Sequence, residues 1–241
     1  MSQPSPEALA RAALRALDEV KPGMRLGLGT GRAAEAFIRR LGQAARDGLS
    51  VTGVATSERS AALAKEEGIR VVSLADDALQ IPTRGSWAPA LDVAFDGADE
   101  VAPDGSLTKG LGGAMLRERV VATEASRFVV LVTPEKLVER LGTRSPLPIE
   151  IVEFALASAT RRLSELGRPV LRKTAAGEVY RTDNGNPVVD LHATESAGWA
   201  DPRALDRRVR ALPGVVDTGF FFDLTKLVLV GGPDAVREIV P

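Results

Sequence analysis

Two spacings of apolar residues alternate along the first half of the chain. Short apolar runs with the length of buried strands are followed by stretches in which apolar residues recur every three or four positions, as on one face of a helix. The expected strands are residues 24–28, 51–55, 69–74, 91–95 and 127–132, and the expected helices begin at residues 6, 33, 58 and 114. Because strands that alternate with helices usually pair in parallel, this order predicts a Rossmann-like, doubly wound and mostly parallel α/β sheet.

The pattern changes near Pro146 and Pro148, which interrupt the alternation and indicate a domain crossing. The strands expected after this point are residues 149–154, 170–173 and 188–192, and the expected helices are residues 155–166 and 202–212. This set of elements predicts a smaller ferredoxin-like α+β domain.

The end of the chain is expected to return to the first domain. The elements expected there are strands at residues 215–222 and 226–230 and a short last helix from Asp234. The expected domains are therefore a Rossmann-like catalytic domain of residues 1–145 plus 218–241 and a ferredoxin-like domain of residues 146–217.

Composition limits the classes of function. The 241 residues carry 31 basic and 32 acidic side chains, so no basic excess invites nucleic acid. The absence of cysteine excludes disulfides, thiol nucleophiles and cysteine-bound metals, and a single histidine leaves little metal chemistry. The chain has no apolar run of about 18 residues and no signal-peptide pattern at its start. We expect a cytoplasmic protein without a nucleic-acid or membrane partner.

Four charged residues between positions 96 and 118 are candidates for catalysis. Asp96 and Asp99 follow the apolar run 91–95 directly, where the strands of an open α/β sheet end and ligands bind. Lys109 lies on a glycine-rich loop, and Glu118 lies about one turn into an expected helix. Taken singly, each is explained as a turn, cap or solvated surface residue. Their joint spacing favours a site with a base, a cation and paired acids.

A glycine loop provides a second candidate site. Gly27, Gly29 and Gly31 alternate with other residues between an expected strand and an expected helix. Such a loop offers backbone N–H groups and the positive end of a helix to a phosphate group. The spacing differs from that of dinucleotide loops, and no P-loop lysine follows. A tight turn with only a structural role explains the loop about equally well.

Other chemistry has weaker support. Asp96, Asp99 and Glu100 have the oxygen ligands that Mg²⁺ prefers, although we expect no metal. His192 follows an apolar run and is interpreted as a strand-end residue. Since the chain also has no G-x-S-x-G segment, acyl-transfer hydrolysis is not expected.

Six motifs, in their order along almost the whole chain, resemble those of ribose-5-phosphate isomerase, type A. They are Gly27-Leu28-Gly29-Thr30-Gly31, Asp96-Gly97-Ala98-Asp99-Glu100-Val101, Lys109-Gly110-Leu111-Gly112-Gly113-Ala114, Arg117-Glu118, Thr182-Asp183-Asn184-Gly185-Asn186 and Pro213-Gly214-Val215-Val216. The resemblance implies an aldose–ketose isomerase of the pentose phosphate pathway that interconverts ribose 5-phosphate and ribulose 5-phosphate without a cofactor. It also implies a Rossmann-like domain, a ferredoxin-like domain and assembly as a homodimer or a dimer of dimers.

The resemblance also assigns roles to residues. It implies that Glu118 is the general base and that Asp96, Asp99 and Lys109 are the surrounding catalytic groups. The substrate-binding residues that it implies, for a phosphorylated pentose, are Thr30, Gly31, Arg32, Ala33, Gly97, Ala98, Gly110, Leu111, Gly112 and Lys136.

This chain departs from the family pattern at two places. Where the family usually has two hydroxyl residues after the last glycine of its loop motif, this chain has Arg32 and Ala33. An N-terminal lysine that often helps to bind phosphate has no match, because Leu9 and Ala10 stand near that place. The phosphate contacts of this chain are therefore expected to differ from the usual ones.

The residue types fit the implied chemistry. Moving a proton between neighbouring carbons needs one carboxylate that accepts and then donates it, for which Glu118 is the candidate. The enediolate that forms between these steps needs a cation and hydrogen-bond donors, which Lys109 and the amides of residues 110–113 can supply. The alternatives are a noncatalytic sugar-phosphate sensor, a coenzyme A transferase with a glutamate nucleophile, and a sugar-phosphate deaminase or lactonase.

Overall fold

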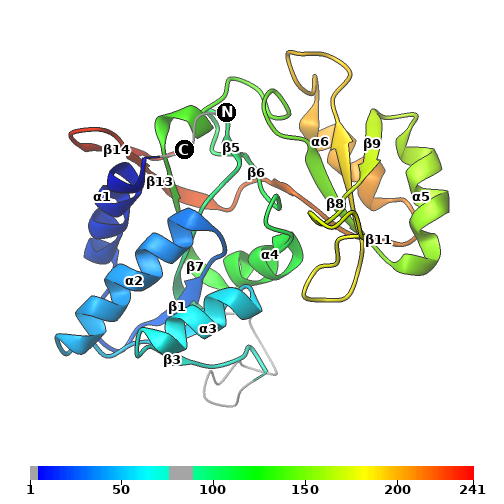
Figure 1. Cartoon of the computed structure of the whole chain (residues 1–241). Helices are drawn as coiled ribbons and strands as arrows, with labels where there is room; N and C mark the ends of the chain where they lie inside the picture. The colour runs from blue at the N-terminus through cyan, green and yellow to red at the C-terminus, as the bar shows by residue number, and fades with distance from the viewer. Residues whose placement is uncertain (1–4, 76–88) are drawn as a thin grey trace. The chain divides into compact units, whose positions relative to one another are not determined.

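The computed structural model describes residues 5–75 and 89–241 (Figure 1). The chain divides into two compact units. The first unit comprises Met1–Ala98, Arg117–Glu135 and Leu224–Pro241, and the second comprises Asp99–Leu116 and Lys136–Asp223. The segments 99–116, 136–145 and 218–223 thus group with the second unit, whereas the sequence placed them with the first. The domain limits expected from the sequence stay a prediction.

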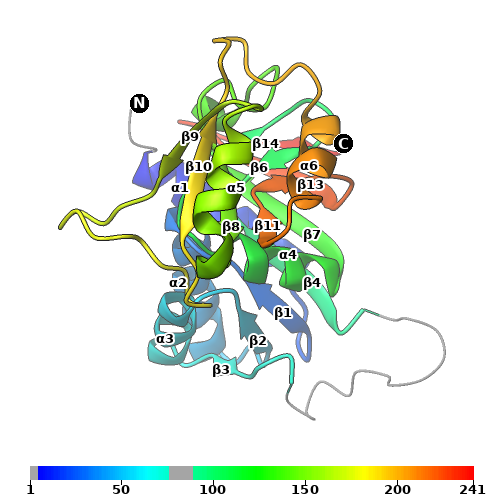
Figure 2. The same ribbon diagram turned by 90° about the vertical axis from the view of Figure 1, so that its right-hand side faces the viewer.

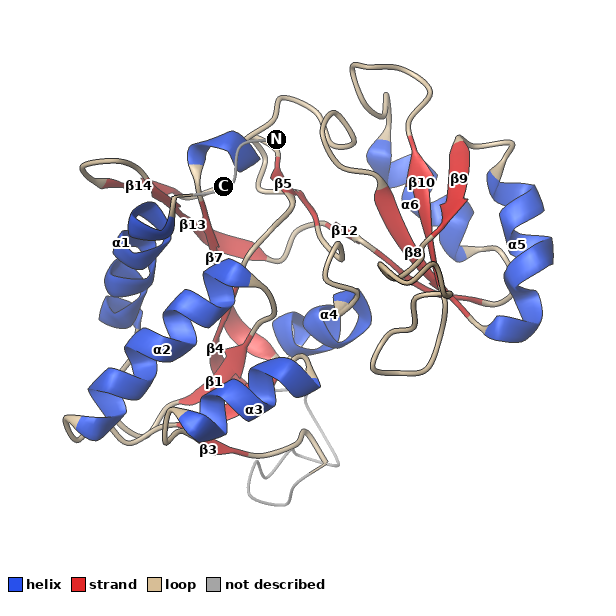
Figure 3. Ribbon diagram, viewed as in Figure 1, coloured by secondary structure: helices blue, strands red, loops and turns tan. Residues whose placement is uncertain are grey.

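The first unit contains a seven-stranded sheet, which is visible in Figure 3. Its strands, in spatial order, are β14 (Val236–Ile239), β13 (Thr225–Gly231), β7 (Ala125–Val132), β4 (Leu91–Asp96), β1 (Arg25–Leu28), β2 (Thr52–Ala55) and β3 (Arg70–Val71). All neighbours pair in parallel except β13 and β14. The strand order reverses between β1 and β4, which is where ligands bind in doubly wound sheets. The predicted Rossmann-like class is confirmed.

Helices cover both faces of this sheet. They are α1 (Pro6–Ala16), the short 3-10 helix η1 (Leu17–Glu19), α2 (Arg32–Arg46), α3 (Glu58–Glu66) and α4 (Met115–Thr123). Two of the predicted helix starts are fixed by serine caps: Ser5 accepts a hydrogen bond from the Ala8 N–H at 3.3 Å, and Ser57 accepts one from the Ser60 N–H at 3.1 Å. The sequence therefore located these helix starts correctly.

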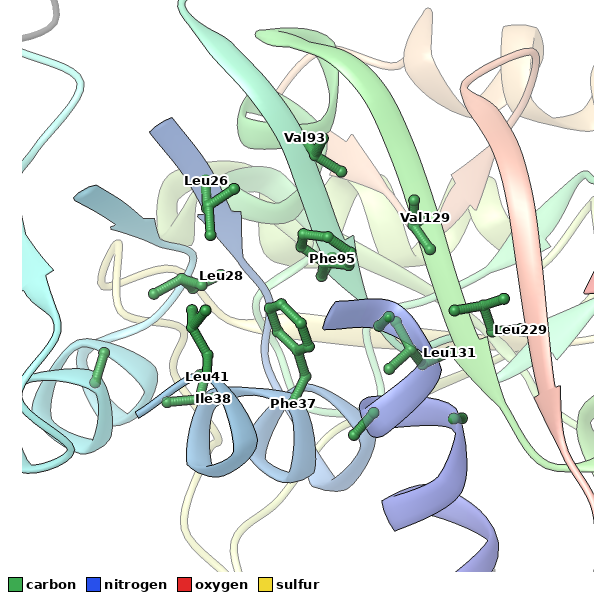
Figure 4. Packing of buried hydrophobic residues seen from close by; sticks show 14 of the residues in the cluster. Leu26, Leu28, Phe37, Ile38, Leu41, Val93, Phe95, Val129, Leu131 and Leu229 are labelled. Carbon is green, nitrogen blue, oxygen red and sulfur yellow. The ribbon is translucent and has the colours of Figure 1, made fainter. Parts of the chain in front are cut away.

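The hydrophobic core lies between the sheet and helices α1, α2 and α3. Leu26 and Leu28 of β1 point to this face and pack with residues of α2, as Figure 4 shows. At its centre the rings of Phe37 and Phe95 stack with centroids 4.1 Å apart. Because successive strand residues point to opposite faces, Gly27 faces the other side. A Cβ atom there would lie 2.4 Å from Val121 of α4, so glycine permits that helix to approach the sheet.

The end of the chain corrects one prediction. Residues from Asp234 do not form the expected helix but turn back into strand β14, antiparallel to β13. The turn is closed by the Gly232 N–H, which donates to the Ala235 carbonyl at 2.9 Å. So short a segment gains little from helix formation, whereas the edge of β13 offers it a row of backbone partners.

The second unit contains a four-stranded antiparallel sheet, seen from another side in Figure 2. Its order is β11 (Val215–Thr218), β8 (Leu147–Ile151), β10 (Val188–His192) and β9 (Arg168–Leu171). The 3-10 helix η4 (Glu153–Ala155) and helix α5 (Leu156–Leu163) follow β8, and helix α6 (Pro202–Arg210) follows β10. The chain order of these strands and helices is that of a ferredoxin-like α+β fold, which confirms this prediction.

A three-stranded sheet in the second unit was not predicted. It pairs β12 (Phe220–Phe221), β6 (Leu107–Thr108) and β5 (Glu100–Val101), each of which has two residues. Strands this short have no readable alternation of apolar and polar residues. The sequence had treated residues 215–222 as one strand, whereas β11 and β12 belong to different sheets.

The motif at residues 182–186 has a structural explanation. The side chains of Thr182, Asn184 and Asn186 each donate a hydrogen bond to the same carboxylate oxygen of Glu150, at 3.0, 3.1 and 2.9 Å. Glu150 is fully buried on β8. Since a buried carboxylate needs such donors, this turn is held against the sheet by the acid that it covers.

The stacked core pair gives a test of this packing. Phe37→Ala should lower the free energy of unfolding by about 3–5 kcal/mol, because the ring is fully buried and leaves a cavity. Urea unfolding followed by circular dichroism measures this loss. Phe154→Ala is the matched control, since that ring is fully exposed, and it should change the free energy by less than about 0.5 kcal/mol. Equal effects of the two substitutions would contradict the described core.

Candidate active site

Asp96 is the last residue of β4, at the carboxyl edge of the parallel sheet. Its Oδ1 atom accepts hydrogen bonds from the Thr30 N–H at 3.1 Å and the Gly97 N–H at 2.7 Å. The side chain is buried, and these backbone donors replace part of the hydration that the carboxylate loses. Asp96 therefore holds the loop after β1, which was expected to bind phosphate, against the end of β4.

The glycine loop after β1 is shaped for close approach. A Cβ atom on Gly29 would lie 2.1 Å from Asp96 Cγ, so only glycine leaves room for that carboxylate. Gly31 has a φ of +98° and directly precedes Arg32, the exposed first residue of α2. No side chain caps α2 at Gly31. Helix ends of this kind bind anions through their first N–H groups.

Three hydroxyl residues that the sequence reasoning missed surround Thr30. Thr30 Oγ1 donates to Ser57 Oγ at 2.8 Å and lies 2.7 Å from Thr56 Oγ1. Ser57 Oγ donates to Ser60 Oγ at 3.0 Å, and Ser60 Oγ donates to the Gly29 carbonyl at 2.6 Å. This chain of hydroxyls fixes the glycine loop from the side of β2. Thr56 and Ser57 directly follow strand β2, which lies next to β1 in the sheet, and this position is the sequence feature that could have identified them.

Glu118 lies on the face of α4 that packs against the sheet. It is 5% exposed and precedes Val121, which contacts the Gly27 position of β1, by one helical turn. The carbonyl of Glu124, just after α4, accepts the Leu91 N–H at 2.8 Å, so the helix ends where β4 begins. The first turn of α4 therefore lies toward the carboxyl ends of the strands. Glu118, in the first half of α4, therefore lies nearer to the sheet edge at which β4 ends with Asp96.

Asp99 belongs to the second unit and is held by a glycine loop of that unit. Its Oδ2 atom accepts the Leu111 N–H at 2.9 Å. Burial raises the pKa of Asp99, although this N–H and the charges of Lys109, Lys136 and Arg172 act in the opposite direction. A carboxyl group with a raised pKa can exchange protons with a ligand more readily than an ordinary aspartate.

Lys109 is buried, with 2% of its surface exposed. Its backbone N–H donates to the Gly219 carbonyl at 2.8 Å, and its ammonium group lies 5.7 Å from the centre of the Phe221 ring. The aromatic face partly replaces water around the cation. A cation with so little solvent around it interacts more strongly with a negative charge nearby.

The segment after Lys109 combines bent backbone with exposed residues. Gly110 and Gly113 have φ values of +100° and +77°, which favour glycine, and Leu111 and Gly112 between them are exposed. Lys136 ends the 3-10 helix η3 (Pro134–Lys136) and is partly buried. The second unit thus brings together Asp99, Lys109 and this loop.

Comparison with known proteins gives the family of the chain. A family model described as ribose 5-phosphate isomerase A (phosphoriboisomerase A) matches residues 52–235. A ribose-5-phosphate isomerase A from Roseiflexus castenholzii is 47% identical over 232 residues, which cover 95% of this chain and 93% of that protein. The chain belongs to the ribose 5-phosphate isomerase A family. The resemblance that the motifs indicated is confirmed.

Solved structures of ribose 5-phosphate isomerases share the fold. The isomerase A from Methanocaldococcus jannaschii aligns with a TM-score of 0.86 and 36% identity, over 97% of this chain and 98% of that one. A D-ribose-5-phosphate isomerase in complex with phospho-erythronic acid aligns with a TM-score of 0.88 and 33% identity, over 99% of this chain and the whole of the other. The mixed α/β architecture is therefore that of ribose 5-phosphate isomerase A structures.

The structure also locates the residues that the sequence had offered for other chemistry. Across residues 5–75 and 89–241, no cluster of three histidine or acidic side chains could hold a metal ion. Glu100, proposed as a possible Mg²⁺ ligand, instead accepts N–H groups of Gly142, Arg144 and Ser145 at 2.6–3.0 Å. His192 is the last residue of β10, as expected.

One further expectation concerned membranes. Within the part of the chain that the structure describes, no helix is both long enough and apolar enough to cross a bilayer.

The raised pKa of Asp99 predicts a pH dependence of stability. The folded chain binds a proton at Asp99 more tightly than the unfolded chain, so this group stabilises the fold below about pH 3.9, the ordinary aspartate value. That contribution is lost as the pH rises through the raised pKa. Asp99→Asn stays neutral and can still accept the Leu111 N–H. The stability of the wild type relative to this variant should therefore fall across that range.

Urea unfolding of both proteins at a series of pH values measures this difference. If the free energy of unfolding of the wild type rises relative to that of Asp99→Asn as the pH increases, the pKa of Asp99 is lowered in the folded chain and the prediction is wrong.

Proposed function

We propose that this chain interconverts ribose 5-phosphate and ribulose 5-phosphate through an enediolate, with Glu118 as the general base. The observation that carries the proposal is its alignment, over 95% of its length, with a ribose-5-phosphate isomerase A that is 47% identical. A related isomerase was solved in complex with phospho-erythronic acid. Such a sugar acid carries a phosphate and a planar, negatively charged carboxylate, which resembles the planar, negatively charged enediolate of a phosphorylated sugar.

Glu118 is suited to carry the proton between the two carbons. The base must take a proton from the carbon beside the carbonyl and return it to the former carbonyl carbon, while a hydroxyl proton moves between the two oxygens. Glu118 is buried and lies toward the sheet edge at which β4 ends.

The two aspartates have different environments and suit different tasks. Two N–H groups hold one oxygen of Asp96 in place, which suits this carboxylate to accept hydrogen bonds from substrate hydroxyls. Asp99 has a raised pKa and is better suited to open the sugar ring and to move the hydroxyl proton. The hydrogen bonds that support each role lie within the unit to which that aspartate belongs.

Lys109 is proposed to stabilise the enediolate oxygen. The buried ammonium group is already desolvated, so its attraction to a developing negative charge is not weakened by water. The N–H groups of Gly110 and Gly112 add donors near the same cation, whereas those of Leu111 and Gly113 are bound to Asp99 and to the Gly110 carbonyl. Gly97 and Ala98 are proposed to contact the sugar beside Asp96, because they follow it in the chain.

The phosphate group is proposed to bind at the start of α2. Gly31 leaves this helix without a side-chain cap, and Arg32, Ala33 and Thr30 lie on either side of the turn. Lys136 of the second unit is proposed as a further substrate-binding cation. Arg32 would supply a charged donor at a position where the family usually has a hydroxyl residue.

The family relationship also indicates a cellular context. We propose a cytoplasmic enzyme of the pentose phosphate pathway that needs no cofactor and assembles as a homodimer or a dimer of dimers. Equilibrium sedimentation gives the oligomeric state directly.

Glu118→Gln tests the proposed base. The metal-stripped wild type should convert ribose 5-phosphate into ketopentose, and the variant should keep its fold while kcat falls about 10²- to 10⁴-fold, the usual contribution of a positioned base. Glu124→Gln is the matched control, because it lies at the opposite end of α4 and should leave kcat unchanged. Near-normal turnover of Glu118→Gln would reject the role, and an inactive wild type would reject the function.

Arg32→Ala tests the proposed phosphate contact. Loss of one charge-assisted hydrogen bond should raise KM for ribose 5-phosphate about 10- to 100-fold, with a smaller effect on kcat. Arg39→Ala removes another exposed arginine of the same helix, one that pairs with Glu67 at 3.2 Å, and should leave KM unchanged. If KM of Arg32→Ala stays within about twofold of wild type, the loop amides bind the phosphate without this side chain.

A further inference from the structure

Arg172, just after β9, binds the backbone of the loop that follows Lys109. Its Nη1 atom donates to the carbonyls of Gly110 at 2.9 Å and Leu111 at 3.1 Å. The other side of the guanidinium binds both carboxylate oxygens of Asp190 on β10, with Nε 2.9 Å from Oδ2. Both side chains are largely buried. Asp190 therefore fixes the arginine, and the arginine fixes two successive peptide groups of the loop.

The carbonyl contacts determine where the N–H groups of the loop point. In a trans peptide the carbonyl and the following N–H point in opposite directions. Because Arg172 holds the Gly110 carbonyl, the Leu111 N–H faces away from the guanidinium, and it donates to Asp99 at 2.9 Å. The same argument turns the Gly112 N–H away from Arg172, because the Leu111 carbonyl is also held. Arg172 and Asp99 thus bind the carbonyl and the N–H of the same peptide group, the one that joins Gly110 and Leu111.

Tyr180 completes this arrangement. Its hydroxyl donates to the Gly112 carbonyl at 3.1 Å, and the guanidinium carbon of Arg172 lies 5.5 Å from the centre of its ring. A Cβ atom on Gly113 would lie 2.2 Å from the tyrosine oxygen, so the loop runs directly against this side chain. Three successive carbonyls are therefore bound by two side chains from another part of the unit.

We propose that Arg172, fixed by Asp190 and supported by Tyr180, is a positioning residue for the isomerisation. It keeps the N–H groups that follow Lys109 directed toward the Asp99 side of the loop. The catalytic part of this inference rests on the proposed function. Holding the donors before the reaction avoids the cost of ordering an exposed glycine loop when the enediolate forms.

Arg172→Gln tests the positioning role with two readouts. In an active enzyme, kcat should fall about 10²-fold, as when a loop donor is misplaced, while KM changes less than about threefold. Amide hydrogen exchange at Leu111 should become at least about tenfold faster, because its N–H is no longer held toward Asp99. Arg172→Lys should not restore kcat, since one ammonium cannot bind two carbonyls and a carboxylate in this geometry.

The matched control is Arg181→Gln in the same unit. Arg181 also binds an acid and a loop carbonyl, Glu153 at 2.7 Å and Gly185 at 3.1 Å, but it does not touch the loop after Lys109. Both readouts should stay within about twofold of wild type in this variant. If Arg172→Gln does not fold, Tyr180→Phe removes only the hydroxyl and should still lower kcat and speed exchange in the loop.

The outcomes separate this inference from the proposed function. Unchanged exchange at Leu111 in folded Arg172→Gln would overturn the positioning of the loop. Faster exchange with an unchanged kcat, or full rescue by Arg172→Lys, would overturn its role in the reaction. Faster exchange in a protein whose wild type has no isomerase activity would reject the proposed function and the catalytic role, while the loop contact itself would stand.

Discussion

Three acidic side chains at and just after the end of β4 are balanced by backbone N–H groups, and the arrangement of the candidate site depends on this pairing. Within five consecutive residues, Asp96 binds the loop after β1, Asp99 binds the loop after Lys109, and Glu100 binds the segment from Gly142 to Ser145. Removing a carboxylate from water costs several kcal/mol unless hydrogen bonds replace the lost hydration. Each acid is therefore stable only if its loop keeps one conformation, and each loop is fixed by its acid.

This pairing links the fold to the proposed chemistry. Glycine is needed where a carboxylate or a tyrosine occupies the space of a Cβ atom, as at Gly29 and Gly113. The loops that result present N–H groups without any change of conformation, which is what stabilisation of a short-lived enediolate requires. Buried Lys109 and the raised pKa of Asp99 follow from the same removal of water. One constraint thus accounts for the motif spacing, the glycines and the perturbed acid.

Sequence reasoning found the features that depend on local patterns. The parallel sheet, the helix starts and the charged residues after β4 follow from apolar spacing and turn chemistry, which neighbouring residues determine. It could not find Arg172 and Tyr180, because they lie more than sixty positions from the loop they hold and only strand pairing brings them there. Strand β14 was mistaken for a helix for the same reason, since the edge of β13 decides its conformation.

Turnover of ribose 5-phosphate in heavy water tests the central claim, proton transfer by Glu118, most directly. A carboxylic acid proton exchanges with solvent before it is returned, so nuclear magnetic resonance should show solvent deuterium bound to carbon in the ketopentose product. Glu118→Gln should lose ketopentose formation and deuterium incorporation together. Deuterium incorporation at the wild-type rate in Glu118→Gln would contradict the account, because another group would then be moving the proton.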